Sequence, residues 1–121
     1  MPGGAKVGAA FLLALALTGG CCHAQDVPPP GEQVSADCAA PVYATDRLVC
    51  SDAALRELDA HMLQLWRMAE ARHRGNGALR DAQIAWFRSR SLCAFGSDHR
   101  ACVVTAYHKR IAALLALVDA P

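Results

Sequence analysis

Residues 55–69 read LRELDAHMLQLWRMA, and this stretch decides the fold class. Its apolar residues recur at spacings of 3, 4, 3 and 4, which places them along one side of an α-helix. They are Leu55, Leu58, Met62, Leu65 and Ala69. Ser51 is suited to cap the start of this helix, and Asp52 would place a carboxylate in its first turn. The Gly-Asn-Gly sequence at 75–77 would end it.

Two more helices are expected after this one. The first runs from about residue 78 to residue 93, and its inner side carries Leu79, Ala82, Gln83, Trp86, Arg90 and Cys93. The second follows a turn at 94–98, capped by Ser97 or Asp98, and its apolar side carries Val103, Tyr107, Ile111, Leu114 and Val118. No segment alternates as a strand does, and short connections make sequential helices antiparallel neighbours. We therefore predict an all-α, antiparallel three-helix domain, preceded by a crossover at 37–50 that Pro41 keeps from being helical.

The N-terminus has the layout of a secretory signal peptide. Lys6 and the amino terminus precede an apolar run from Val7 to Leu17, which is too short to cross a bilayer as a helix. Small residues at the required positions favour cleavage after Ala24. Lipoprotein processing at Cys21 is the alternative, and it would anchor the chain at the outer membrane or cell surface. No later run is long enough to span a membrane, so we expect an exported chain that is periplasmic or secreted.

The domain limits follow from this layout. Residues 1–24 are assigned to the signal peptide, and residues 25–36, with three consecutive prolines, to a flexible tether. Residues 37–119 form the predicted helical domain.

Four cysteines remain after cleavage: Cys38, Cys50, Cys93 and Cys102. In an exported chain of this size an even set of cysteines predicts a disulfide framework, for which three pairings are possible. The local pairing, Cys38–Cys50 and Cys93–Cys102, is favoured because each pair brackets a turn beside a helix. Cys93, His99 and Cys102 could be drawn as zinc ligands, but a structural zinc site needs four ligands and reduced thiols. We therefore expect no metal and no cofactor.

Charge is distributed unevenly along the exported chain, although its acidic and basic residues are equal in number. Residues 25–59 carry seven acids against two bases, and the remainder carries four acids against nine bases. A chain without net positive charge in an oxidising compartment is not expected to bind nucleic acid.

The linked motifs of the chain resemble one known family, the lysozyme-inhibitor LprI-like family. The residues that carry the resemblance are Cys38, Val49-Cys50-Ser51-Asp52, Leu58-Asp59, Gln83-x-x-Trp86-x-x-x-Arg90-x-x-Cys93 and Cys102-x-x-x-x-Tyr107-x-x-Arg110-Ile111-x-x-Leu114. The match extends from Asp37 to about Leu117. Two departures are Trp66, where the family usually has Tyr, and Ala53, where it commonly has Pro; both residues are compatible with a helix. The resemblance implies a small exported helical domain, with lysozyme inhibition established for few members.

The polar residues on the inner helix faces have two interpretations. Gln83, Trp86 and Arg90 could form a strip that contacts a ligand, or they could belong to a buried structural network. We favour the network, with Asp59 as the partner of Arg90 or Arg110 and with Tyr107 beside them, because an unpaired buried guanidinium is costly. No nucleophile with a base and no facing pair of carboxylates is evident, so catalysis is not expected.

Two binding functions are compatible with these features. The first is inhibition of lysozyme, with Asp46, Asp52 and Glu57 as candidate contacts, because an acidic stretch could steer a strongly basic enzyme. The second is an envelope or stress-related interaction module with another protein partner and no effect on lysozyme.

Overall fold

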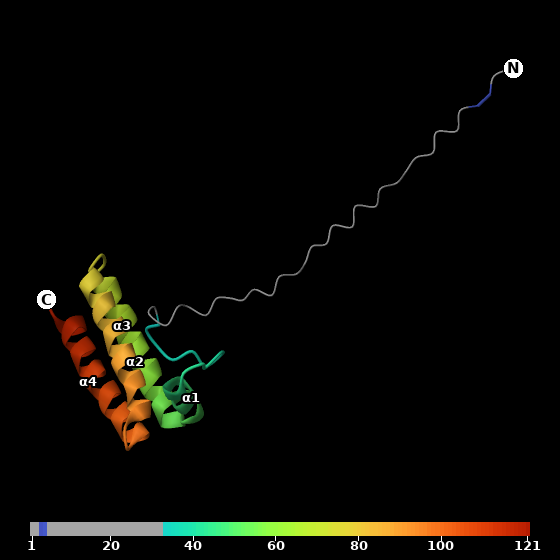
Figure 1. Ribbon diagram of the computed structural model, residues 1–121. Helices are drawn as coiled ribbons and strands as arrows, with labels where there is room; N and C mark the ends of the chain where they lie inside the picture. Colours follow the sequence, from blue (N-terminus) through green and yellow to red (C-terminus); the bar gives the residue numbers. More distant parts are fainter. Residues whose placement is uncertain (1–2, 5–32) are drawn as a thin grey trace.

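The computed structural model describes residues 3–4 and 33–121 (Figure 1). Its elements are α1 (Ala44–Ser51), α2 (Ala53–Arg72), α3 (Gly77–Ser91), a 3₁₀ helix η1 (Leu92–Phe95) and α4 (His99–Asp119). The described residues contain no strand, and the all-α prediction is confirmed. The three long helices are those expected from the sequence, and α1 is additional. Apart from residues 3–4, the predicted signal peptide lies outside the described part of the chain, as do residues 25–32 of the predicted tether.

The helix α1 corrects the prediction that residues 37–50 form a non-helical crossover. Pro41 lies before the first residue of α1, so its ring interrupts no helical hydrogen bond. Eight residues are too few to show a periodic pattern or to form a stable isolated helix. Tertiary contacts hold α1 instead, because Thr45, Asp46 and Val49 are buried against the other helices.

Carboxylate and amide side chains cap the long helices. Asp52 accepts a hydrogen bond from the backbone N–H of Leu55 at 3.1 Å, so Asp52 caps α2 and the prediction of Ser51 as the cap is wrong. Ser51 is instead the last residue of α1. Asn76 caps α3 and Asp98 caps α4 in the same way as Asp52 caps α2.

The three long helices run up, down and up, as predicted. Arg100 pairs with Asp52 where α4 and α2 begin, and His73 Nε2 lies 3.0 Å from the carbonyl oxygen of Leu117 where they end. These two helices are therefore parallel. The indole N–H of Trp86 on α3 donates to the carbonyl of Ala106 on α4 at 3.0 Å, in the middle of both helices. Because a single short turn joins α2 to α3, the latter runs in the opposite direction.

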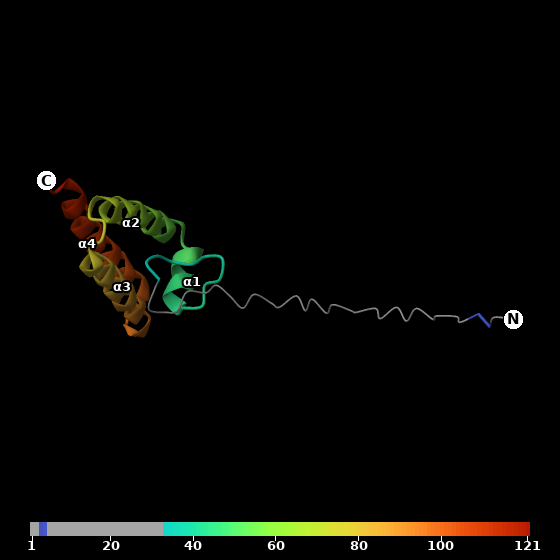
Figure 2. The same cartoon turned by 90° about the horizontal axis from the view of Figure 1, so that it is seen from above.

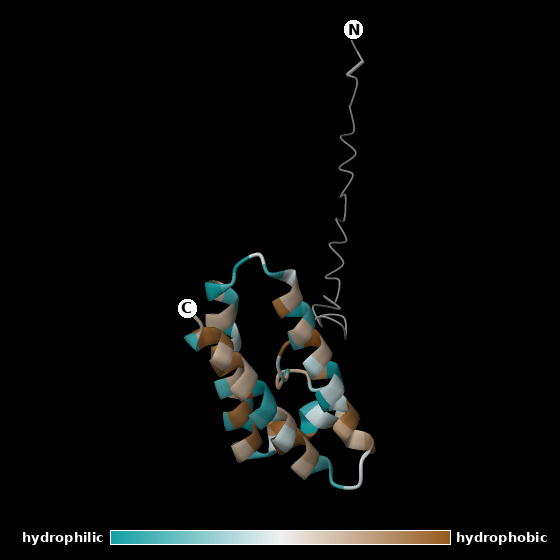
Figure 3. Cartoon of the chain, turned by 90° about the vertical axis from the view of Figure 1, so that its left-hand side faces the viewer, coloured by the Kyte–Doolittle hydropathy of each residue, from teal (hydrophilic) through white to brown (hydrophobic). Residues whose placement is uncertain are grey.

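The short turn does not make α2 and α3 close neighbours along their length. They diverge from the turn, and α1 lies in the opening between them (Figures 2 and 3). Residues 33–36 bridge the same opening, because Ala36 N–H donates to Asp59 on α2 and the side chain of Gln83 on α3 donates to the carbonyl of Val34. Gln33 is buried and Val34 packs against the core, so the packed domain begins by Gln33 and not at the predicted residue 37.

The core contains most of the apolar residues predicted from periodicity, which are Leu55, Met62, Leu65, Ala69, Leu79, Val103, Tyr107, Ile111 and Leu114. On α3 the prediction was partly wrong. Phe87 is buried although it was not assigned to the core, and Ala82 is exposed. The inner face of α3 is thus rotated toward Phe87, because α1 packs there as well as α4.

Both disulfides follow the local pairing. Cys38 is bonded to Cys50, which ties the N-terminal segment to α1, and Cys93 is bonded to Cys102, which ties η1 to α4. Each loop closure restricts the unfolded chain and stabilises a domain of this size by about 2 to 4 kcal/mol.

The helix α4 is long and apolar enough to cross a membrane, by length and composition alone. Here it packs against the other helices of the domain through Val103, Tyr107, Ile111 and Leu114.

Candidate functional site

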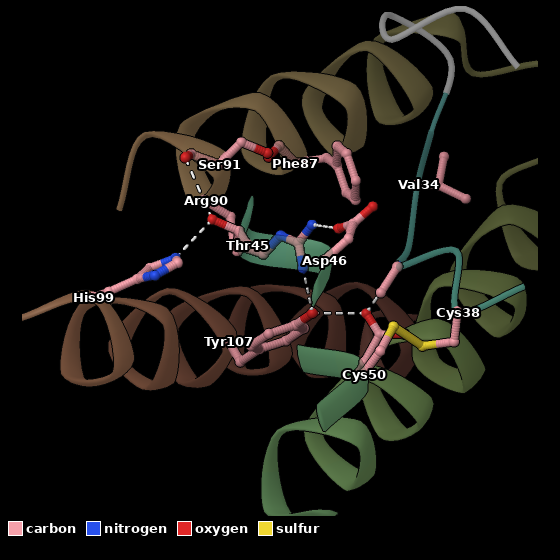
Figure 4. Close-up of polar contacts among 12 residues, drawn as sticks. Val34, Cys38, Thr45, Asp46, Cys50, Phe87, Arg90, Ser91, His99 and Tyr107 are labelled. Carbon is pink, nitrogen blue, oxygen red and sulfur yellow. Dashed lines mark hydrogen bonds and ion pairs between the residues drawn. A yellow bond between two sulfur atoms is a disulfide. The ribbon is translucent and has the colours of Figure 1, made fainter. Parts of the chain in front are cut away.

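A buried ion pair joins α3 to α1. Arg90 on α3 donates from Nη2 to the carboxylate of Asp46 on α1, and both side chains are excluded from solvent. Its Nη1 donates to the hydroxyl of Tyr107 on α4 at 2.8 Å (Figure 4). The ring of Phe87 lies 4.3 Å from the guanidinium carbon, so a cation–π contact covers one face of the group.

The Tyr107 hydroxyl extends this pair to α2. It accepts from Arg90 and donates to Asp59 Oδ1 at 2.7 Å. The same carboxylate oxygen accepts from the backbone N–H of Ala36 at 3.2 Å. We call Asp46, Asp59, Arg90 and Tyr107 the polar layer. It links all four helices and the N-terminal segment through one continuous chain of hydrogen bonds.

A second group of polar contacts lies beside the polar layer. Arg110 Nε donates to Gln83 Oε1 at 2.7 Å, while Gln83 Nε2 donates to the carbonyl of Val34 at 2.8 Å. The Trp86 ring meets the Tyr107 ring edge to face, with centroids 5.3 Å apart. Gln83, Trp86 and Arg110 therefore belong to the structural network that the sequence predicted.

The surroundings change the acidity of two members of the polar layer. Burial raises the pKa of Asp59, and the hydrogen bonds from Tyr107 and Ala36 oppose that shift. Burial also raises the pKa of the Tyr107 hydroxyl, which therefore remains a neutral donor to Asp59. Burial lowers the pKa of Arg110.

The partner predicted for Arg90 was wrong. Asp59 forms a salt bridge with neither Arg90 nor Arg110; the Tyr107 hydroxyl stands between Asp59 and Arg90, and Asp46 carries the ion pair. No pattern in the sequence distinguishes Asp46 from the other acids, because it lies in an eight-residue helix that the periodicity did not reveal.

The three acids proposed as a docking face do not form one. Asp46 is buried in the polar layer and cannot reach a partner, which corrects its assignment to the surface. Asp52 caps α2 and pairs with Arg100 at 2.8 Å, and the bond from Arg100 lowers the pKa of Asp52. Of these three acids, only Glu57 is exposed and forms no salt bridge with the described residues. It lines a shallow groove of about 560 Å³ with Ala54, Leu58, His61, Arg100 and Val104.

Three of the four side chains of the polar layer are closed off from solvent. Asp46, Arg90 and Tyr107 are each at most 1% exposed, and each is hydrogen-bonded to another member. Within residues 3–4 and 33–121, no group of three or more His, Cys, Asp or Glu side chains could hold a metal ion. The arrangement therefore fixes how the helices pack, and contacts with other molecules must use the exterior.

The exterior has one conspicuous apolar feature that the sequence analysis did not assign. Phe95 is 88% exposed and Leu92 is 65% exposed, and both belong to η1. We call this element the apolar turn.

Comparison of the chain with protein-family models, with curated proteins and with solved structures yields no match.

Proposed function

We propose that the chain is an exported protein that inhibits a lysozyme by protein–protein binding and has no catalytic activity of its own. The observation that carries the proposal is the four-cysteine pattern linked to the Gln83, Trp86 and Arg90 helix, which resembles the LprI-like family. The two disulfides support export, because such bonds persist in oxidising compartments. Processing after Ala24 would release the chain into the periplasm or the medium, and processing at Cys21 would anchor it to a membrane.

Binding is favoured over catalysis by what surrounds the polar side chains. Catalytic acids and bases need access to substrate, whereas Asp46 and Arg90 are buried and paired with each other and Asp59 accepts a hydrogen bond from Tyr107. An inhibitor needs only a complementary exterior surface, and a rigid, disulfide-bonded helical domain can present one at a small entropic cost.

The alternative is an envelope interaction module with a different protein partner. The loss of the acidic face favours it, since Asp46 is internal and Asp52 is paired with Arg100. A strongly basic lysozyme would then gain little electrostatic steering from this domain.

Lysis of peptidoglycan by lysozyme, measured by turbidity with and without the purified mature chain, tests the proposal. We expect slower lysis that depends on the concentration of the chain and persists at raised salt, because the acidic residues do not form a steering face. Unchanged lysis at a large molar excess would contradict lysozyme inhibition. A pull-down from envelope extract with the same chain would then test the alternative.

A further inference from the structure

The apolar turn presents two large side chains to solvent within four residues. Phe95 and Leu92 have the two largest exposed fractions among the large apolar side chains of the described residues, at 88% and 65%. Single exposed apolar residues are common on protein surfaces. An aromatic ring that is almost wholly exposed beside an exposed leucine adds nothing to the core, and aromatic residues are enriched at protein–protein interfaces.

The backbone of the apolar turn is held at both ends. Cys93, between the two exposed side chains, is buried and is bonded to Cys102 in the first turn of α4. Just before the turn, the carbonyl of Ser91 accepts a hydrogen bond from the Thr45 hydroxyl, which also lies 2.9 Å from His99 Nε2 (Figure 4). A binding element fixed in this way loses little conformational entropy when a partner buries it.

The charges nearest in the chain favour an acidic partner surface. Arg88 lies one helical turn before Leu92 and is exposed, and the described residues offer it no salt bridge. Asp98, after the turn, uses its carboxylate to cap α4 through the N–H of Ala101. The turn therefore presents an apolar tip, with an exposed arginine that forms no salt bridge with the described residues on one side of it and a carboxylate engaged as a helix cap on the other.

We propose that the apolar turn enters the substrate cleft of lysozyme, with Phe95 and Leu92 against its sugar-binding surface and Arg88 toward its catalytic carboxylates. This inference rests on the proposed function. Glycosidases carry two carboxyl groups beside the bond that they cleave, so the cleft is locally acidic even in an enzyme that is basic overall. The charge of Arg88 and the apolar tip are complementary to such a cleft, whereas a general acidic face is not needed.

The test compares inhibition by four forms of the mature chain: wild type, Phe95→Ser, Arg88→Gln and Met68→Ser. Met68 is the matched control, since it is 46% exposed and apolar but lies in the second half of α2. We expect Phe95→Ser to raise the concentration for half-inhibition about 30-fold, the usual effect of truncating an aromatic hot spot of about 2 kcal/mol. Arg88→Gln should raise it several-fold, and Met68→Ser should leave it unchanged. Circular dichroism of each form checks that the helices are intact.

A competition measurement tests whether the chain binds in the substrate cleft of lysozyme. A chito-oligosaccharide that fills the cleft should compete with the wild-type chain for lysozyme. If the wild type inhibits but Phe95→Ser inhibits equally well, or if the oligosaccharide does not compete, the apolar turn is not the inhibitory element and the proposed function stands. If the wild type does not inhibit at all, both the proposed function and this inference are wrong.

Discussion

The polar layer and the apolar turn are adjacent in the sequence, and they differ in burial and in the contacts that their side chains make. Arg90 is buried, paired with Asp46 and covered by Phe87, while Leu92, two residues later, is exposed. The first region joins four helices through hydrogen bonds of charged side chains, whereas the second packs against α1, α3 and α4, is tied to α4 by a disulfide, and leaves Leu92 and Phe95 exposed. The buried charged side chains thus hold the helices together, and the side chains exposed for contact in the apolar turn are a leucine and a phenylalanine.

The charge pattern of the sequence does not show which acidic side chains are exposed in the folded domain. Three of the acids in the acidic stretch are engaged internally or at a helix cap, namely Asp46, Asp52 and Asp59. Within the described residues, these three acids are therefore not free to form a common acidic face.

Replacing Arg90 should have the largest effect. Arg90→Ala leaves the Asp46 carboxylate buried without its cation, and breaking a buried pair in this way costs about 3 to 5 kcal/mol of unfolding free energy. Arg88→Ala, two residues earlier but exposed, is the matched control and should change stability by less than about 0.5 kcal/mol. Urea unfolding of both variants measures the difference, and equal losses would show that the polar layer does not hold the helices.

Removing the Cys93–Cys102 disulfide should have the next largest effect on stability. The double variant Cys93→Ser and Cys102→Ser should lose about 2 to 3 kcal/mol, from the restriction that a loop of this length imposes on the unfolded chain. Removing Cys38 and Cys50 together should cost a similar amount, because the loop is of similar length. Amide hydrogen exchange distinguishes the two, since only the first should accelerate exchange at Gly96, whose N–H donates to Cys93 in the turn. Unchanged exchange there would mean that the turn is held without its disulfide.

The polar layer should also respond to pH through Asp59. Because burial raises the pKa of Asp59 in the folded chain, its contribution to stability is fully present below the unfolded pKa and is lost as the pH rises through the folded pKa. Asp59→Asn does not titrate at this position. The stability of the wild type relative to this variant should therefore increase as the pH falls from about 7 to about 4. Urea unfolding at each pH of that series measures the difference in unfolding free energy between the two chains. A wild type that becomes less stable relative to Asp59→Asn as the pH is lowered would contradict the raised pKa of Asp59.

The smallest effect on stability is expected in the apolar turn. Phe95→Ser removes a ring that contacts mainly solvent, so the unfolding free energy should change by less than about 0.5 kcal/mol. Phe87→Ser, eight residues earlier on the buried side, is the contrasting control and should cost several kcal/mol. A large loss for Phe95→Ser in thermal unfolding would mean that the ring packs against the domain in solution.

Much of this architecture could be predicted from the sequence, because the long helices have periodic apolar stripes and effective caps. The disulfide pairing was the one favoured for its short spacings. The predicted single polar network is divided in the structure: Arg90 and Tyr107 belong to the polar layer, whereas Gln83 and Arg110 bond to each other beside it. The partner of Arg90 could not be predicted, since Asp46 becomes internal only when α1 folds against α2 and α3. A helix of eight residues depends on those contacts for its stability, so no local pattern reveals it. The exposure of Leu92 and Phe95 was not predicted either, because the sequence analysis gave these two residues no role and exposure depends on how η1 packs.

A double-mutant cycle on Arg90 and its two nearby acids tests whether the polar layer joins the helices. The cycle combines Arg90→Met with Asp46→Asn, and a parallel cycle combines Arg90→Met with Asp59→Asn, with unfolding free energies measured in urea. The direct ion pair predicts a coupling of about 1 to 3 kcal/mol between Arg90 and Asp46, and a smaller one between Arg90 and Asp59, which interact through the Tyr107 hydroxyl. Additive effects at Arg90 and Asp46, or a stronger coupling to Asp59, would contradict the polar layer as the element that joins the helices.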